Sequence, residues 1–154
     1  MFTLPELEAA RDLIHASFPG TPQYAWPLLA ERTGTETWVK HENHTPTGAF
    51  KLRGGLVYAD RLKRERPDVG GIISATRGNH GQSLAWAGRR HGVPVTIVVP
   101  LHNSPEKNAA MRAQGARLIE HGEDFEAARE EAARLAKVEG LEFAPSFAPD
   151  LVKG

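Results

Sequence analysis

The sequence predicts an α/β fold in which a parallel β-sheet is covered by helices on both faces. Two observations lead to this prediction. From about residue 69 onward, short apolar segments alternate with longer helix-forming segments, which is typical of repeated strand–helix units. The apolar segments are hydrophobic almost throughout, and this pattern indicates strands that are buried on both faces of a parallel sheet.

The first third of the chain is less regular. Its predicted elements, in order, are a helix over residues 1–18, an extended connector over 19–27, a strand over 35–42, a turn over 43–48 and a helix over 49–66. The strand is centred on Trp38 and Val39. Gly54 and Gly55 weaken the last helix, and Pro67 ends it.

The remaining elements alternate between strand and helix. We predict strands over residues 69–76, 93–100, 116–122 and 141–147, with helices over 77–92, 104–115 and 123–140 between them. The second of these helices has Ser104 as its N-cap and Pro105 at its first position. Gly92 and Gly140 end the other two.

Composition excludes several classes of protein. Lys plus Arg and Asp plus Glu both number 19, so there is no excess of positive charge for binding a nucleic acid. The chain has no cysteine and therefore no disulfide or thiolate chemistry. It has neither an apolar run long enough for a membrane span nor the pattern of a secretory signal. We expect a cytoplasmic protein that acts on a small molecule.

Two loops stand where ligands gather in open parallel sheets, at the carboxyl ends of strands. The later loop, "SATRGNHGQS", passes from a strand into a helix, where free N–H groups and the helix dipole favour an anion such as a carboxylate. The Thr76 hydroxyl adds a donor, and the Asn79 amide can orient a ring oxygen. Alternatively, Gly78 only permits a tight turn and Asn79 only caps the helix.

The earlier loop, "NHTPTGAFK", ends at Lys51. A lysine amine is a nucleophile or base only when deprotonated, a state that burial or a neighbouring cation favours. The alternative is an ordinary solvated lysine. Neither the phosphate-binding pattern G-x-x-x-x-G-K-[ST] nor the dinucleotide pattern G-x-G-x-x-G is present. His41, His44 and His80 lack a clear carboxylate partner, so we predict no metal site.

Taken together, "KHENHTPTGAFKLRGG" and "SATRGNHGQSLAWAGRRHGVPVTIVVP" resemble the threonine/serine dehydratase family of pyridoxal-phosphate enzymes, which has the tryptophan-synthase-like fold known as fold type II. The resemblance extends to "TPQYAWPLL", "EKNAAMRAQGARLIEHG" and "FAPSFAPDLVKG". It implies a pyridoxal phosphate cofactor. It also implies elimination of water from threonine, serine or a hydroxyaspartate, giving a keto acid and ammonia.

The resemblance also implies roles for individual residues. Lys51 would carry the cofactor as a Schiff base, and its freed amine would remove the substrate's α-proton. Phe50 would pack against the pyridine ring, and Asn79 would hydrogen-bond the 3-oxygen of that ring. The residues expected to bind the substrate carboxylate are Thr76, Gly78, Asn79 and His80.

The sequence departs from the family in two respects. Arg77 stands where the family usually has a small residue, so it either pairs with a second substrate carboxylate or points to solvent. The glycine-rich loop that holds the cofactor phosphate, and the polar residue that contacts the pyridine nitrogen, are not found in the 154 residues. We therefore expect a truncated fold: part of a large domain over residues 1–67, a small domain over 68–147, and the start of a return to the large domain over 148–154.

Truncation carries an expectation about exposed surface. The apolar residues expected to lack a full partner surface are Trp26, Leu28, Leu29, Trp38, Val39, Leu56 and Val57. We expect a homo-oligomer and little activity from the chain alone. Two alternatives remain open: β-replacement chemistry of the cysteine-synthase type, against which the Gly-Asn-His loop favours a dehydratase, and a non-catalytic binding or assembly fragment.

Overall fold

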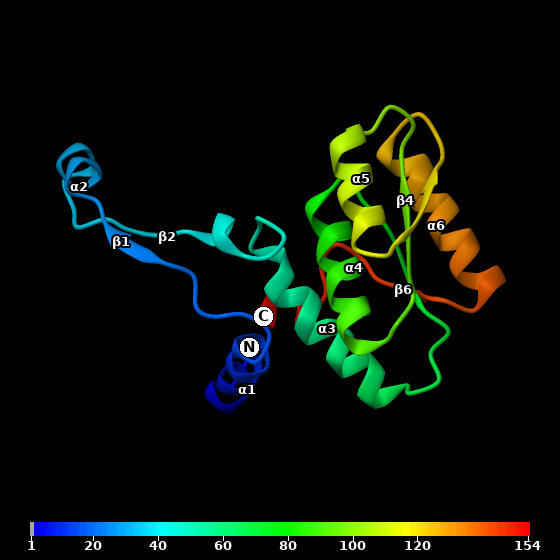
Figure 1. The fold of residues 1–154 in the computed structure, drawn as a ribbon, viewed down its shortest axis with the longest axis horizontal. Coiled ribbons are helices and arrows are strands. Elements are labelled where there is room, and N and C mark those ends of the chain that lie inside the picture. The colour runs from blue at the N-terminus through cyan, green and yellow to red at the C-terminus, as the bar shows by residue number, and fades with distance from the viewer. Residues whose placement is uncertain (1) are drawn as a thin grey trace.

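A four-stranded parallel sheet lies at the centre of the computed structural model, which describes residues 2–154 (Figure 1). In chain order, its strands are β3 (Ile72–Ala75), β4 (Val95–Val99), β5 (Arg117–Glu120) and β6 (Glu142–Phe143). They are arranged β5-β4-β3-β6, and every neighbouring pair is parallel. The predicted α/β fold with a parallel sheet is therefore confirmed.

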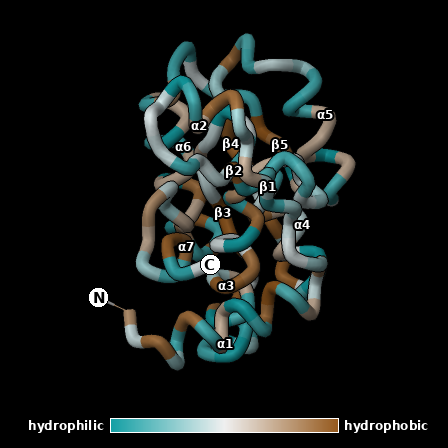
Figure 2. The backbone as a smooth tube through the Cα atoms, turned by 90° about the vertical axis from the view of Figure 1, so that its left-hand side faces the viewer, coloured by the Kyte–Doolittle hydropathy of each residue, from teal (hydrophilic) through white to brown (hydrophobic). Residues whose placement is uncertain are grey.

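Helices cover both faces of this sheet. They are α4 (Asn79–His91) and α5 (Pro105–Ala113) on one face and α6 (Phe125–Glu139) on the other. Successive residues of β4 point to opposite faces, so Ile97 packs with Leu84 of α4 while Val98 packs with Ala132 of α6. Figure 2 shows the hydrophobic strands in the interior of the molecule. Burial on both faces explains why these strands are apolar without alternation.

The helix ends follow the predicted signals. The Ser104 hydroxyl accepts a hydrogen bond from the Lys107 N–H at 3.3 Å, and Pro105 is the first residue of α5. Gly92 and Gly140 take left-handed conformations directly after α4 and α6. These local signals therefore predict where the helices begin or end without any knowledge of tertiary contacts.

The helix that carries Lys51 is packed more tightly than we expected. This helix, α3 (Lys51–Glu65), lies against α4, and α1 (Leu4–His15) covers its other side. Leu56 is fully buried and Val57 is 7% exposed, so the expectation that these two residues lack a partner surface is wrong. Residues of α1 and α4 cover Leu56 and Val57, so no additional strand is needed to bury them.

An arm projects away from the sheet and its helices (Figure 1). It consists of β1 (Gln23–Ala25), α2 (Pro27–Thr33) and β2 (Trp38–Lys40), with the two strands paired antiparallel. As expected, Trp26, Leu28, Leu29 and Trp38 are exposed, between 41% and 80%. The helix α2 lies partly in the predicted connector and was not predicted. Pro27 begins it at the first helical position, where the missing N–H costs nothing.

The last helix, α7 (Pro149–Lys153), returns to the side of α3. Arg61 of α3 pairs with the buried Asp150 carboxylate at 2.6 Å and anchors α7 there. The division of the chain at residues 67 and 148 stays a prediction. Within residues 2–154, no helix combines the length and the apolar composition needed to cross a bilayer. The same residues contain no cluster of three potential metal ligands.

Candidate functional site

One threonine side chain holds the turn before α3. The Thr45 hydroxyl accepts a hydrogen bond from the Ala49 N–H and donates one to the Ala49 carbonyl, each at 2.9 Å. Gly48 has a φ of 67°, a left-handed conformation in which a Cβ would be strained. The turn therefore fixes the direction in which the chain enters α3, and it places Lys51 as the first residue of that helix.

Glu42 ties this turn to α3 and to the segment before the arm. Arg53 forms two hydrogen bonds with the Glu42 carboxylate, at 2.7 and 2.9 Å, and the Thr21 hydroxyl donates a third at 2.6 Å. The hydrogen bond with Arg53 is the main reason that the pKa of Glu42 is lowered. Because paired donors on a carboxylate fix orientation as well as distance, this network holds the turn rigidly against the helix that carries Lys51.

A pocket of about 210 Å³ opens beside Lys51. The Lys51 amine lies 5.4 Å from the ring centres of both Phe50 and Phe147, which is within range of cation–π attraction. The Lys51 carbonyl accepts a hydrogen bond at 2.6 Å from the buried Ser83 hydroxyl. Residues of α4 therefore hold the backbone from which this amine projects.

His80 brings a neutral imidazole to the same pocket. It is 5% exposed, and its Nε2 atom has no hydrogen-bond partner among residues 2–154. Burial first, and the nearby charge of Lys51 second, lower the pKa of His80 from 6.5 to about 4, although a hydrogen bond with the Ala144 backbone acts in the opposite direction. At neutral pH this imidazole is therefore uncharged, and its buried nitrogen is free to meet a ligand.

The turn after β3 is organised around Thr76. The Thr76 hydroxyl accepts a hydrogen bond from the Gly78 N–H at 3.1 Å, and both residues are buried. Asn79, the first residue of α4, is exposed. Arg77 is also exposed and lines a second hollow, of about 450 Å³, together with Lys107. The turn thus sends Arg77 and His80 into two different hollows.

The structure brings three of the predicted site residues into one pocket, namely Phe50, Lys51 and His80. The others, Thr76, Gly78 and Asn79, occupy the adjoining turn, while Arg77 lies outside that pocket. Sequence reasoning missed Phe147, which reaches the pocket because β6 pairs with β3 and the chain then returns to α3. No local signal marks Phe147, since only the tertiary path brings it near Lys51.

The chain is similar to known enzymes over most of its length. A family model described as "Pyridoxal-phosphate dependent enzyme" matches residues 16–154. The chain is 33% identical over 132 residues to the biosynthetic L-threonine dehydratase IlvA of Haemophilus influenzae, covering 86% of the chain and 26% of that relative. It is also 33% identical over 147 residues to the L-threonine ammonia-lyase of Thermotoga maritima, covering 96% of the chain and 36% of that relative.

A solved structure has the same architecture. It is a pyridoxal 5'-phosphate-dependent aspartate racemase, to which the chain is 30% identical with a TM-score of 0.91. The match covers 99% of this chain and 48% of the racemase chain. The chain therefore spans about a quarter to a third of the two curated relatives above and about half of this solved chain.

Proposed function

Because this chain belongs to the family of pyridoxal-phosphate dependent enzymes, we propose that it carries the reactive lysine of an ammonia-lyase that removes water from a hydroxy amino acid. The products are a keto acid and ammonia. The relatives named as a threonine dehydratase and a threonine ammonia-lyase support this reaction class. Since the chain covers much less than their full length, their activity enters here only as part of the proposal.

One observation carries the proposal: the Lys51 amine, two aromatic rings and the unpaired Nε2 atom of His80 share a single pocket. These residues fit pyridoxal phosphate, which presents an aldehyde to an amine, a flat ring to an aromatic side chain, and polar ring atoms to a buried nitrogen. They do not provide for its phosphate. Gly54 and Gly55 lie inside α3, where helix hydrogen bonds occupy their N–H groups.

Each side chain of the site has a part in the proposed reaction. Pyridoxal phosphate, when bound, supplies an electron sink for the negative charge that develops on the substrate's α-carbon. Lys51 Nζ would hold the cofactor through its aldehyde carbon and, once the substrate's amine has taken that place, the freed Lys51 amine would take the proton from the α-carbon. Phe50 and Phe147 lie at cation–π distance from this amine and would offer aromatic surface to the ring of the cofactor. The neutral His80 neither repels a cationic amine nor competes for its proton, because its pKa is about 4.

The turn after β3 is proposed to bind the substrate carboxylate. The Thr76 oxygen already accepts from Gly78, which leaves the hydroxyl proton available to donate. The first N–H groups of α4, from Asn79 and His80, add donors at the positive end of the helix dipole. The Asn79 side chain would then hydrogen-bond the ring oxygen of the cofactor and orient the ring.

Threonine, serine and a hydroxyaspartate remain the candidate substrates. The name of the aspartate racemase shows that a solved relative acts on a dicarboxylic amino acid, which supports the last of the three. We also propose a cytoplasmic homo-oligomer. The exposed aromatic residues of the arm support self-association, because surfaces of this kind mark contact sites. Sedimentation of the purified chain tests the oligomeric state.

Covalent trapping tests the function directly. The 154-residue chain is incubated with pyridoxal phosphate, reduced with borohydride and mapped by mass spectrometry, so that even weak binding leaves a permanent label. We expect the label on Lys51 and its loss in Lys51→Ala. Lys63→Ala, on the same helix, is the matched control and should label as the wild type does.

Two results would count against the proposal. A label on a different lysine would remove Lys51 from its role. No label on any lysine would favour the alternative of a non-catalytic binding or assembly fragment. In the active whole protein, Lys51→Ala should also abolish ammonia release from hydroxy amino acids, as measured with a coupled assay.

A further inference from the structure

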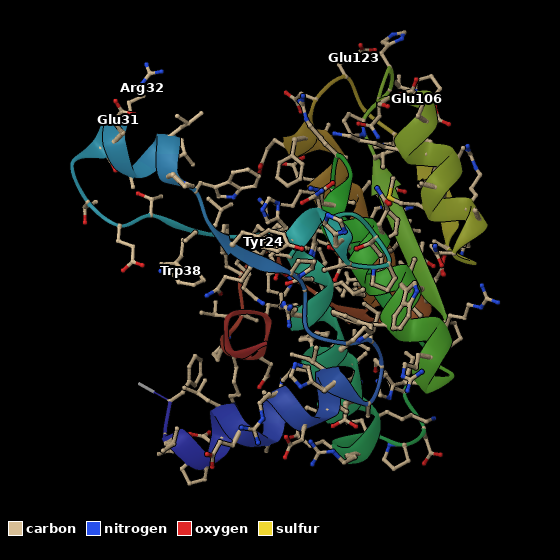
Figure 3. All side chains as sticks on the ribbon, turned by 60° about the vertical axis from the view of Figure 1, so that its left-hand side comes forward. Tyr24, Glu31, Arg32, Trp38, Glu106 and Glu123 are labelled. Carbon is tan, nitrogen blue, oxygen red and sulfur yellow. The ribbon has the colours of Figure 1, made fainter. Side chains whose placement is uncertain are left out.

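The second hollow lies beyond the carboxyl ends of the strands β3, β4 and β5. Its lining includes Arg77 from the turn after β3, His102 from the loop after β4, Lys107 from the first turn of α5 and Glu123 from the loop after β5. Figure 3 shows Glu123 at this end of the molecule, where α5 begins near Glu106. Two loops and the first turn of α5 therefore contribute charged side chains to one hollow of about 450 Å³.

Two cations of this hollow form no ion pair with any of residues 2–154. Neither Arg77 nor Lys107 forms an ion pair within residues 2–154, whereas Arg61 and Arg112, for example, are each paired with a carboxylate. Glu123 is the one acidic residue in the described lining, so these three side chains leave a net positive charge. The hollow is therefore suited to an anion that matches the surplus charge.

The approach of Lys107 to the turn depends on a glycine. A Cβ at position 78 would lie 2.7 Å from Lys107 Cδ, so a side chain here would require the lysine stem to shift from its place against this turn. Lys107 is thereby brought beside the residue that follows Arg77 in the chain. The two cations approach the hollow from the turn and from α5.

Some neighbouring polar groups already form hydrogen bonds with one another. Asn103 donates a hydrogen bond to the Asn108 side chain at 2.7 Å, and the Ser104 hydroxyl accepts from the Lys107 N–H. The guanidinium of Arg77 and the ammonium of Lys107 remain as donors without any acceptor capacity. Groups that can only donate select carboxylates and similar anions over neutral ligands.

The two hollows are lined by residues that are close in the chain. His80 lines the pocket of Lys51 and Arg77, three positions earlier, lines the second hollow. Three residues span at most about 11 Å even when fully extended. We propose that Arg77 and Lys107 bind the second carboxylate of a dicarboxylic amino acid whose α-carbon lies at Lys51, an inference that rests on the proposed function.

Anion titration tests this proposal without any cofactor. The 154-residue chain is titrated with succinate, and in parallel with butyrate, at constant ionic strength and followed by amide NMR shifts. We expect succinate to move the signals of Arg77, Gly78 and Lys107, and butyrate to bind more weakly. Because these groups are exposed, Arg77→Gln and Lys107→Gln should each weaken succinate binding about threefold to tenfold.

Two further variants sharpen the test. Glu123→Gln removes the opposing charge and should tighten succinate binding by a similar factor. Arg89→Gln is the matched control, because Arg89 is exposed, has no ion pair within the described residues and lies near Val95, at the amino end of β4. Arg89→Gln should leave the affinity for succinate unchanged.

The outcomes separate this inference from the proposed function. Equal binding of succinate and butyrate, or an Arg77→Gln effect no larger than that of Arg89→Gln, overturns the inference and leaves the trapping of Lys51 untouched. If succinate binds as expected but Lys51 cannot be trapped, the hollow is an anion site without a substrate role, and the inference is again overturned. Selective binding together with trapping at Lys51 supports it.

Discussion

The buried imidazole of His80 makes the stability of the protein depend on pH. Its pKa is about 4 in the folded chain, against 6.5 for an ordinary histidine. As the pH falls from 6.5 to 4, the unfolded chain takes up a proton that the folded chain does not. The stabilisation is therefore complete above pH 6.5 and declines below it, by about 3 kcal/mol in total. Burial also lowers the pKa of His91, so protonation of this residue likewise reduces the free energy of unfolding as the pH falls.

Replacing His80 by glutamine should reduce this pH dependence. We expect the free energy of unfolding of the wild type to fall by about 2–3 kcal/mol more than that of His80→Gln between pH 7 and about pH 4.5. Urea unfolding at the two pH values measures the difference. His121→Gln, which removes an exposed imidazole, is the control. Identical pH dependence in His80→Gln and the wild type would show that the imidazole is not buried as described.

Individual site residues were predictable to different degrees. Lys51 and His80 belong to contiguous motifs, but the expectation that both motifs follow strands of one parallel sheet is wrong. Lys51 follows β2 of the two-stranded antiparallel arm and His80 follows β3 of the parallel sheet, so the packing of α3 against α4 brings them into one pocket. Phe147 and Lys107 could not be anticipated, since tertiary packing alone brings them to the two hollows. For Arg77 the sequence left two directions open, and the structure places it in the hollow that it shares with Lys107.

At the scale of elements, α3 and α7 touch through their backbones. A Cβ at Gly54 would overlap the Leu151 carbonyl oxygen, so the two helices can approach this closely only if residue 54 is glycine. The sequence indicated Gly54 and Gly55 only as weak points of a helix. The contact between Gly54 and Leu151 joins two distant parts of the chain. Helix propensity, which is a local property, could therefore not predict that glycine is needed here.

Gly54→Ala should therefore destabilise the protein, although alanine is the better helix former by about 1 kcal/mol. Overpacking against Leu151 should outweigh that gain and cost about 1–3 kcal/mol net. Denaturant unfolding measures the stability, and hydrogen exchange of residues 149–153 shows whether α7 has been displaced. A stabilised variant with unchanged exchange would mean that α7 does not pack on α3.

Regular elements were predicted well and irregular ones poorly. All seven predicted elements between residues 69 and 147 are present, because caps, glycines and buried apolar strands give strong local signals. The arm was predicted only in part. Its helix α2 has 7 residues and no buried residue, so it shows no amphipathic pattern from which it could have been recognised.

The molecule as a whole divides into a packed part and an exposed arm. The core joins α1, α3 and α7 to the sheet and its helices, while β1, α2 and β2 contain no buried residue (Figure 3 shows Tyr24 and Trp38 on this arm). This description concerns packing alone, and the predicted domain boundary at residue 67 stays a prediction. Because Leu52, Leu56 and Ala59 are fully buried, α3 is energetically part of the sheet-containing body.

Hydrogen exchange should reveal this division. We expect the amides of α3 to be protected nearly as well as those of α4, and the amides of residues 23–40 to exchange much faster. Mass spectrometry of peptides from a dilute sample measures both. Fast exchange in α3 would show that this helix is no more stable than the arm and would support the predicted boundary at residue 67. Strong protection of residues 23–40 would show that the arm is covered, as it would be in an oligomer.

The order β5-β4-β3-β6 also affects how the chain can fold during its synthesis. The central strand β3 pairs on one side with β4, which follows it soon in the chain, but on its other side with β6, which is synthesised only after β4 and β5. Until Phe143 is made, one edge of β3 carries unpaired N–H and C=O groups that another chain could capture. Pairings of such long sequence separation form slowly. The nascent chain is therefore prone to aggregation through this edge of β3 from the time that β3 is made until β6 becomes available.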